Sequence, residues 1–377
     1  MLINKDFNHS YWETKFFRQP ADLLVIGGGI VGLSTAISFK QKHKKSKVLV
    51  LERGILPNGA STKNAGFACF GSAGELLDDL THSSEQTVFE TVHMRWTGLQ
   101  LLRQRIGDKA MALQKYGGFE LFENTTEYDK VFSQLTYLNR QILKVCNLPK
   151  CFKPSKQFQN SFKGVKAILK NQYEAQIDTG LMMHKLHQVA LSLGIQYFGG
   201  VEVQKITELT QHAAVHTPSG SFLAFQVVVA TNGFATSLLN IQDLQPARAQ
   251  VLVTKPIPNL HIKGTFHFDK GYYYFRNIDQ RILFGGGRNL DLKGETTSQQ
   301  GLHSAIQQRL KHLLKNKILL NTPFQIDQRW SGIMGVGNEK KPIIRRCSPH
   351  VTAAVRMGGM GVAIGSLVGA RTVDLIA

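Results

Sequence analysis

Hydrophobic and polar positions near the start of the chain switch between short apolar runs and a helical repeat. Residues 22–26 form an apolar run, residues 27–32 form a glycine-rich turn, and helical spacing follows from 30 to 42. A second apolar run occupies residues 48–51. A strand, a helix and a second strand in this order make a βαβ unit, so the pattern predicts one here.

Two further patterns predict a long helix and an antiparallel hairpin. Between Val88 and Ile106, apolar residues recur every three or four positions, which places them on one face of an amphipathic helix. Farther along, the β-rich runs 272–275 and 282–284 flank residues 277–280, which predict a four-residue turn. The hairpin does not fit a Rossmann-type pattern, so it indicates a second kind of sheet.

Segments of dinucleotide-fold character also lie far from the first βαβ unit. Residues 227–233 form an apolar run that ends in a turn, and residues 358–369 form a glycine-rich segment near the end of the chain. We therefore expect a nucleotide fold assembled from discontinuous pieces. At 377 residues the chain is also long enough for two domains.

Composition indicates a folded globular protein with an unusual excess of positive charge. Apolar residues make up 42% of the chain, while 45 Lys and Arg against 26 Asp and Glu give a formal net charge of +19. Residues 130–173 contain nine Lys and Arg but no acidic residue. We favour a solvated basic face, since no nucleic-acid motif accompanies it, although a docking surface for RNA or an acidic membrane is the alternative.

Two expectations concern the environment of the protein. The first twenty residues lack a long apolar core and no stretch reaches about 18 uninterrupted apolar residues, so we expect a cytoplasmic protein. The four cysteines form no CxxC pair and no His/Cys metal spacing, so we expect neither a disulfide framework nor a metal site.

The first glycine turn carries the clearest chemistry. Gly27, Gly29 and Gly32 fit the pattern G-x-G-x-x-G directly after a strand, where glycines allow a tight turn, close approach of a pyrophosphate and packing of the helix. Glu52 ends the next strand, where a carboxylate can accept the ribose hydroxyls and would repel a 2′-phosphate. Together they predict an adenine dinucleotide other than NADP.

Short motifs spread over nearly the whole chain resemble the D-amino-acid oxidase superfamily, which includes glycine oxidase, sarcosine oxidase and the γ-glutamylputrescine oxidases. They occur in the family's order and are Glu52-Arg53, the run Gly59-Ala60-Ser61-Thr62-Lys63-Asn64-Ala65-Gly66, the turn 230–233, the hairpin 271–288, Trp330-Ser331-Gly332 and Gly359-Met360-Gly361.

The resemblance implies FAD as the cofactor. Residues 61–66 would then run beside the ribityl chain and flavin ring, Val203 would contact the adenine, and residues 359–362 would begin a helix aimed at the flavin. The partial positive charge of a helix N-terminus would stabilise negative charge on the reduced flavin. The expected cofactor-binding residues are Gly27, Gly29, Ile30, Val31, Gly32, Glu52, Arg53, Ser61, Asn64, Ala65, Gly66, Val203, Gly233, Gly359, Met360, Gly361 and Val362.

The hairpin is expected to line the substrate pocket. Strand alternation puts Tyr272 and Tyr274 on one face and Tyr273 and Phe275 on the other, so only one pair can face a cavity. In relatives that resemble glycine oxidase, a tyrosine matching Tyr272 holds the substrate.

The carboxylate clamp of the amino-acid-specific members is missing here. They place an arginine four residues after the tryptophan, where this chain has Met334. A substrate carboxylate would therefore need another cation, and the candidates are Arg288, Arg329, Lys63 and Arg356. Tyr272, Arg288 and Lys63 are the expected catalytic residues. Because the run 329–335 is closer to the γ-glutamylputrescine oxidase-like branch, amine and amino-acid substrates both stay open.

The sequence thus predicts an α/β plus α+β fold: a Rossmann-like FAD-binding domain with a parallel sheet, and a substrate domain with a mainly antiparallel sheet. Its expected segments are 18–82, 164–242 and 326–377 for the first domain, and 83–163 and 243–325 for the second.

The expected reaction is oxidation of a small amine or amino acid by hydride transfer to flavin N5, with oxygen or another electron acceptor reoxidising the flavin. The FAD should be non-covalent, because residues 334–346 lack the cysteine that sarcosine oxidase-like relatives use. One alternative is a tRNA-modifying oxidase, whose basic segment would bind the phosphates of the RNA. The other is a non-catalytic flavin-binding protein.

Overall fold

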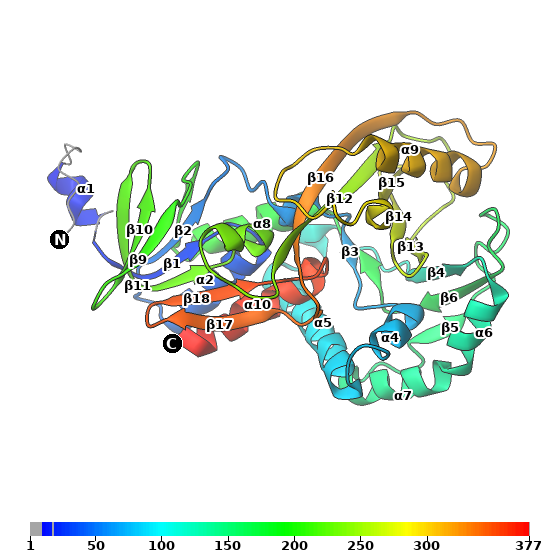
Figure 1. The fold of residues 1–377 in the computed structure, drawn as a ribbon, viewed down its shortest axis with the longest axis horizontal. Coiled ribbons are helices and arrows are strands. Elements are labelled where there is room, and N and C mark those ends of the chain that lie inside the picture. Colours follow the sequence, from blue (N-terminus) through cyan, green and yellow to red (C-terminus); the bar gives the residue numbers. More distant parts are fainter. Residues whose placement is uncertain (1–9, 17–18, 377) are drawn as a thin grey trace.

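Two large sheets lie side by side along the long axis of the molecule (Figure 1). This computed structural model describes residues 10–16 and 19–376. The fold is a mixed α/β architecture in which one sheet is mainly parallel and the other mainly antiparallel.

The first sheet has the order β17-β18-β11-β1-β2-β8, and β10 and β9 continue from β11. Neighbours from β18 to β8 are parallel, whereas β17 and the β9-β10-β11 meander are antiparallel. Its strands are β1 (Ala21–Ile26), β2 (Val48–Glu52), β8 (Gln196–Gly199), β9 (Lys205–Glu208), β10 (Ala213–Thr217), β11 (Gly220–Val229), β17 (Ile343–Ser348) and β18 (Val351–Val355). The predicted βαβ unit and the strand at 227–229 are confirmed, and the latter is the end of the longer β11.

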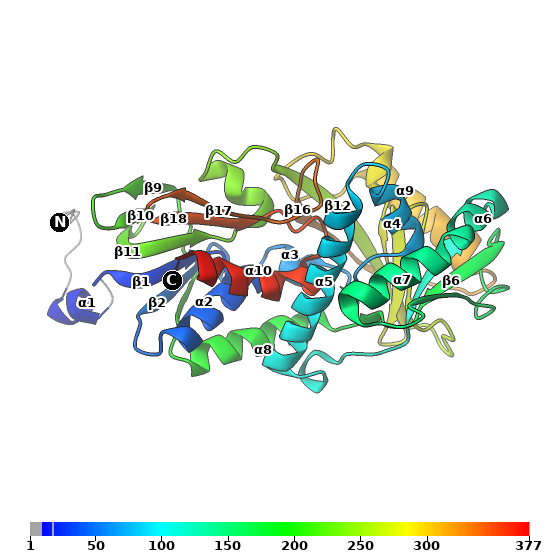
Figure 2. The ribbon, with the colours of Figure 1, turned by 90° about the horizontal axis from the view of Figure 1, so that it is seen from below.

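Four helices cover one face of this sheet (Figure 2). They are α2 (Ile30–Lys42), α5 (Glu85–Ile106), α8 (Thr179–Ser192) and α10 (Gly361–Ile376). Glycines let α10 approach its neighbours closely: a Cβ at Gly369 would lie 2.6 Å from the Cβ of Ser34 on α2. Likewise, a Cβ at Gly98 on α5 would lie 2.3 Å from the carbonyl oxygen of Ala363. Helix packing therefore accounts for part of the glycine-rich segment at the end of the chain.

The second sheet has the order β16-β12-β15-β14-β13-β4-β6-β5, and all of its neighbours are antiparallel except β13 and β4. Its strands are β4 (Gly118–Phe122), β5 (Phe152–Pro154), β6 (Ala167–Asn171), β12 (Gln245–Thr254), β13 (Thr265–Phe268), β14 (Tyr273–Ile278), β15 (Arg281–Gly286) and β16 (Ile326–Val336). A core of stacked phenylalanines fills the face under α9 (Ser304–Leu313), with the Phe266 and Phe275 ring centroids 4.7 Å apart.

The predicted hairpin exists, but its four-residue turn was wrong. Asn277 pairs with Ile282 and Ile278 with Arg281, so only Asp279 and Gln280 form the turn. Both turn residues have positive φ, 46° and 59°, as a two-residue turn that matches the strand twist requires. The turn length was wrongly predicted because the Asn-Gly and Asp-Gly pairs typical of two-residue turns are absent here.

A separate pair of short strands and several further α-helices complete the described elements. The strands β3 (Phe67–Ala68) and β7 (Ala175–Gln176) pair with each other. The remaining helices are α1 (Tyr11–Phe16), α3 (Ala60–Lys63), α4 (Ala73–Asp79), α6 (Thr125–Ser133) and α7 (Leu135–Cys146). Among residues 10–16 and 19–376, no helix has the length and apolar character needed to cross a bilayer.

Strand pairing divides the chain differently from the expected segments. Strands β6 and β16 lie within segments expected in the FAD-binding domain, yet both pair in the second sheet. Helix α5 falls in an expected substrate-domain segment, yet it packs against α10. We therefore propose domain boundaries that move these three elements. The expected start at residue 18 lies outside the described residues.

Candidate active site

A cavity of about 1120 Å³ runs from the glycine turn after β1 to α4 and the β14–β15 hairpin. Its walls come from both sheets and from the N-terminal ends of α2 and α10. Pockets for single drug-sized ligands usually measure roughly 300–1,000 Å³, so this cavity has room for a large cofactor together with a small substrate.

One end of the cavity is built mainly from backbone. Gly27 has a φ of 107°, which glycine adopts without strain, and α2 begins just after Gly29. The Glu52 carboxylate accepts hydrogen bonds from the backbone N–H groups of Gly28, at 2.8 Å, and Gly54, at 3.1 Å. These bonds hold the carboxylate at the cavity wall, and the residues fit an adenine dinucleotide with its phosphates at the helix N-terminus.

Most of the expected cofactor-binding residues line this cavity. They are Gly27, Gly29, Ile30, Val31, Glu52, Arg53, Ser61, Asn64, Ala65, Val203, Gly359, Met360, Gly361 and Val362. Gly32, Gly66 and Gly233 lie behind the wall and permit close packing. A Cβ added at Gly32 would lie 1.9 Å from the Gly27 carbonyl oxygen. One added at Gly66 would lie 2.4 Å from the Ile177 carbonyl oxygen, and one added at Gly233 would lie 2.3 Å from that of Met334.

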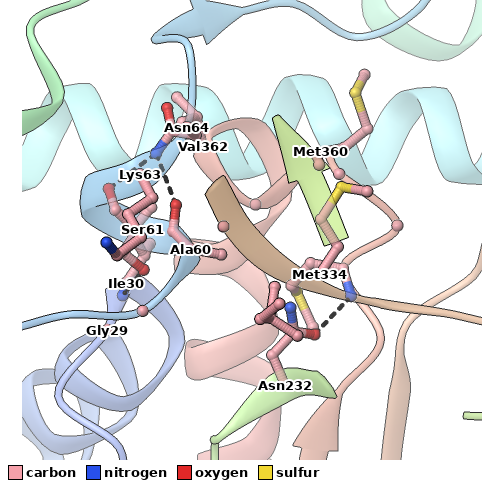
Figure 3. Close-up of a pocket in the computed structure, with 18 of the residues that line it drawn as sticks. Gly29, Ile30, Ala60, Ser61, Lys63, Asn64, Asn232, Met334, Met360 and Val362 are labelled. Carbon is pink, nitrogen blue, oxygen red and sulfur yellow. Dashed lines mark hydrogen bonds between the residues drawn. The ribbon is translucent and has the colours of Figure 1, made fainter. Parts of the chain in front are cut away.

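The middle of the cavity brings α3, β16 and the start of α10 together (Figure 3). The Ser61 hydroxyl accepts a hydrogen bond from the Ile30 N–H at 3.0 Å, so α3 is tied to the first turn of α2. The Asn64 amide donates to the carbonyl oxygens of Ala60 and Ser61, at 3.1 and 2.8 Å, and thereby closes the α3 turn. These side chains shape the wall that would face a flavin.

Sequence reasoning missed Asn232, which supports the start of α10. Its side-chain oxygen accepts hydrogen bonds from the N–H groups of Arg356, at 3.1 Å, and Met357, at 3.2 Å. Residues 358–359 then turn with positive φ before α10 begins at Gly361. Met334 lies against this turn, 3.4 Å from where a Cβ of Gly359 would be. The position of the missing arginine clamp is thus filled by a thioether in the cavity wall.

The other end of the cavity carries the predicted tyrosines. Tyr272 and Tyr274 line it, whereas Tyr273 and Phe275 are buried in the phenylalanine core, as the strand alternation predicted. Tyr272 is 41% exposed and so lies at the mouth. Burial raises the pKa of the Tyr274 phenol to about 12, so it stays a neutral hydrogen-bonding group at physiological pH.

Of the four candidate carboxylate partners, the structure brings two to the cavity. Arg288 and Lys63 line it. Arg329 instead donates to Gln307 at 2.7 Å, and Arg356 is 5% exposed and bound to Asp243. The Arg288 Nε atom is buried and meets no hydrogen-bond partner in the part of the chain that the structure describes.

Several charged residues at this end belong to no sequence motif, so they could not be predicted from the sequence. Lys340 precedes β17, lines the cavity and pairs with Asp79 at 2.6 Å and Glu75 at 3.2 Å, both on α4. Although burial raises it, the cations Lys340 and Arg95 bring the pKa of Glu75 down to about 2. Burial lowers the pKa of the His267 imidazole to about 4, so this ring is neutral.

Comparison with known proteins places this architecture in one family. The family model described as FAD dependent oxidoreductase matches residues 22–375. The chain is 22% identical to the probable oxidoreductase OrdL of Haemophilus influenzae over 95% of its own length and 83% of that protein. It is 24% identical to the γ-glutamylputrescine oxidoreductase of Escherichia coli, over 94% and 83% of the two chains.

A solved structure has the same fold. The L-proline dehydrogenase of P. horikoshii superimposes with a TM-score of 0.76 at 18% identity, covering 96% of this chain and 94% of that one. Because the family model covers nearly the whole sequence, the chain belongs to the FAD dependent oxidoreductase family and is an enzyme that uses FAD.

Proposed function

We propose that this enzyme oxidises a small amine or amino acid at a carbon atom that bears nitrogen. The observation that carries the proposal is the continuity of the cavity. The same space that fits the dinucleotide at the Gly27 end extends to the two tyrosines and the cations Arg288 and Lys63. A substrate bound there would lie beside the start of α10, which is where the flavin ring is expected.

FAD, when bound, would supply the chemistry, which is acceptance of a hydride from the carbon that bears nitrogen, and the imine product would hydrolyse in water. The protein contributes position and electrostatic field. The N-terminus of α10 opens on the cavity through Met360, Gly361 and Val362, so its free N–H groups favour negative charge at that point. Oxygen or another acceptor would take up the electrons.

The contacts of Arg288 favour substrates that carry a carboxylate. Among residues 10–16 and 19–376, its Nε atom has no hydrogen-bond partner, and its Nη2 atom donates a 3.5 Å hydrogen bond to the Thr296 hydroxyl. A guanidinium can hold a carboxylate through two parallel hydrogen bonds, so Arg288 would take the place of the arginine that Met334 replaces. Tyr272, at the mouth, would orient the substrate through its hydroxyl.

Product analysis tests the proposal. The enzyme, supplied with air or an artificial electron acceptor, should convert glycine or putrescine into one carbonyl product and one ammonia for every two electrons transferred. Glycolate, which carries a hydroxyl where glycine carries nitrogen, is the matched control and should not react. Turnover of glycolate at the rate of the amines, or electron transfer without release of ammonia, would overturn the assignment.

A further inference from the structure

Three glutamates meet beneath the substrate end of the cavity. Glu75 lies on α4, Glu120 on β4, and Glu174 just before β7. Glu174 is 2% exposed and Glu120 is 7% exposed. Buried carboxyls are rare unless they are paired or functional, so each of the three needs an explanation.

Two of the three glutamates have partners that account for them. Glu120 accepts hydrogen bonds from the Ser72 hydroxyl at 3.1 Å and from the Gly74 N–H at 3.0 Å. Glu75 pairs with Lys340 at 3.2 Å and with Arg95 at 3.8 Å. Both carboxyls thereby stabilise the position of α4.

Glu174 differs from the other two glutamates in the hydrogen bonding of one carboxylate oxygen. Its Oε1 atom is buried and finds no hydrogen-bond partner among the residues that the structure describes. A buried polar atom without a partner is unfavourable, because it has lost its hydrogen bonds to water. Glu75 and Glu174 line the cavity and Glu120 does not. Since Glu75 is already paired with Lys340 and Arg95, Glu174 is the glutamate of this group whose unpaired oxygen can gain a partner when a substrate enters.

The fold makes room for this carboxyl. A Cβ at Gly118 would lie 1.9 Å from the Glu174 Oε2 atom and 3.1 Å from its Cβ, so a larger residue at 118 would push the glutamate aside. The backbone amides of Phe70 and Gly71 face the same carboxyl. Next to them is Cys69, whose Sγ atom lies 4.0 Å from the Met360 Sδ atom. Glu174 therefore lies where the substrate end of the cavity approaches the start of α10.

An amine substrate poses a chemical problem that such a group can solve. Alkyl ammonium groups have a pKa near 10, as the lysine side chain does, so the substrate arrives protonated. It must lose that proton before the nitrogen lone pair can assist removal of the hydride. Lys63, Lys340 and Arg288 are cations and His267 is neutral with a lowered pKa, which leaves a carboxylate as the natural acceptor.

We propose that Glu174 binds the substrate's ammonium nitrogen and takes one of its protons, so that carboxylate and ammonium become carboxylic acid and neutral amine. The inference rests on the proposed amine oxidation. No other reactant is needed, because the proton lost by nitrogen is the proton gained by the carboxyl. The unpaired Oε1 atom acquires its hydrogen-bond partner in the same step.

The surroundings of Glu174 suit this exchange. Burial raises its pKa to about 8, with Glu75 and Glu120 adding to the shift and the amides of Phe70 and Gly71 opposing it. The titratable groups that interact with it are Glu75 from α4, Glu120 from β4, Cys69 after β3 and Cys151 before β5, and Arg95 from α5 lies beside Glu75. Glu174 can thus hold a proton near neutral pH and release it to water afterwards.

The pH profile of anaerobic flavin reduction tests the proposal. The probe is whichever of glycine, sarcosine, L-proline and putrescine reduces the wild-type flavin fastest. The second-order rate constant should rise with pH to about 8 and then stay level to about 10, because carboxylate and ammonium coexist in that interval. A wild-type rate constant that keeps rising to the pKa of the amine would overturn the proposal. This measurement uses the wild-type enzyme alone.

Two variants sharpen the test. In Glu174→Gln the rate should climb about tenfold per pH unit up to about pH 10, so the deficit near pH 8 should be about a hundredfold. Glu120→Gln, a buried neighbour outside the cavity wall, should keep the level region. Identical profiles for both variants would overturn the role of Glu174. If no amine reduces the wild-type flavin, amine oxidation itself fails, which is a distinguishable result.

Discussion

The two ends of the cavity are built on opposite principles. At the nucleotide end, backbone amides, glycine conformations and a helix N-terminus make the wall, and the Glu52 side chain is itself held by two backbone N–H groups. At the substrate end, side chains from α4, β13, the β14–β15 hairpin and the loop before β17 meet across the space. The first end depends on where side chains are absent, and the second depends on which side chains are present.

This difference teaches where each kind of substitution should act. Adding atoms to a glycine at the nucleotide end should remove the cofactor. Removing polar atoms at the substrate end should slow the reaction and leave the cofactor in place.

Acid precipitation should release all of the flavin. Cys69 lines the cavity, yet no cysteine lies between residues 334 and 346, where sarcosine oxidase-like relatives attach the cofactor. After precipitation and centrifugation, the yellow colour should be in the supernatant. A yellow pellet that yields a flavin-linked peptide mass would show that the nucleotide end also uses a covalent bond.

Gly29→Val should cost most of the bound FAD. The backbone at Gly29 has φ −80° and ψ −172°, which any residue can adopt, and an added Cβ would meet the Ser61 hydroxyl oxygen at 2.8 Å. The fold should therefore survive, while the branched side chain occupies the approach to the pyrophosphate. We expect affinity for FAD to fall at least about tenfold, or roughly 1.4 kcal/mol.

The control for Gly29→Val is the stability of the protein without cofactor. Thermal unfolding of the FAD-free variant should match that of FAD-free wild type, and FAD titration should then show the loss of affinity. Full flavin occupancy in the variant would break the assignment of this turn to the pyrophosphate.

Arg288→Ala and Tyr272→Phe should each slow anaerobic flavin reduction by about 1 to 3 kcal/mol in activation free energy and leave FAD content unchanged. Arg288 should matter for a carboxylate-bearing substrate such as glycine and hardly at all for putrescine. Arg329→Ala is the matched control, because that guanidinium binds Gln307 instead of facing the cavity. Equal losses on glycine and putrescine would remove Arg288 as the carboxylate partner.

Glu120 should make stability depend on pH in a defined direction. Burial raises the pKa of its carboxyl to about 7, against the opposing hydrogen bonds from Gly74 and Ser72. A raised folded-state pKa gives stability that is complete below the unfolded pKa, near 4.5, and is lost as pH rises through 7. Relative to Glu120→Gln, wild type should lose on the order of 1–3 kcal/mol of unfolding free energy between pH 4.5 and 7.

Urea unfolding of both proteins at a series of pH values measures this difference. A constant gap between wild type and Glu120→Gln would mean that the carboxyl titrates alike in the folded and unfolded states.

The nucleotide end could be predicted from sequence because its signals are local. The glycine turn, the strand that ends at Glu52 and the helix from Ile30 to Lys42 are each encoded within a few residues, and the structure has them at those positions. The hairpin strands were predicted for the same reason, although the turn itself was shorter than expected.

The substrate end could not be predicted in this way. Lys340 and Glu75 lie 265 positions apart and meet only after both sheets have formed. Glu174 belongs to no motif, and its burial depends on the missing side chain of Gly118 on β4. Arg329 and Arg356 had the right chemistry for a carboxylate clamp, but strand orientation and burial direct them elsewhere. Here function depends on contacts between residues far apart in the chain, and such contacts produce no periodic pattern in the sequence.

Anaerobic bleaching of the flavin shows directly whether the substrate end of the cavity binds and oxidises amines. The purified enzyme would be mixed, without oxygen, with glycine, sarcosine, L-proline or putrescine, and with glycolate as the hydroxyl control. We predict that the visible flavin absorbance disappears with at least one amine and persists with glycolate. Unchanged absorbance with every amine, or equal bleaching by glycolate, would contradict the account.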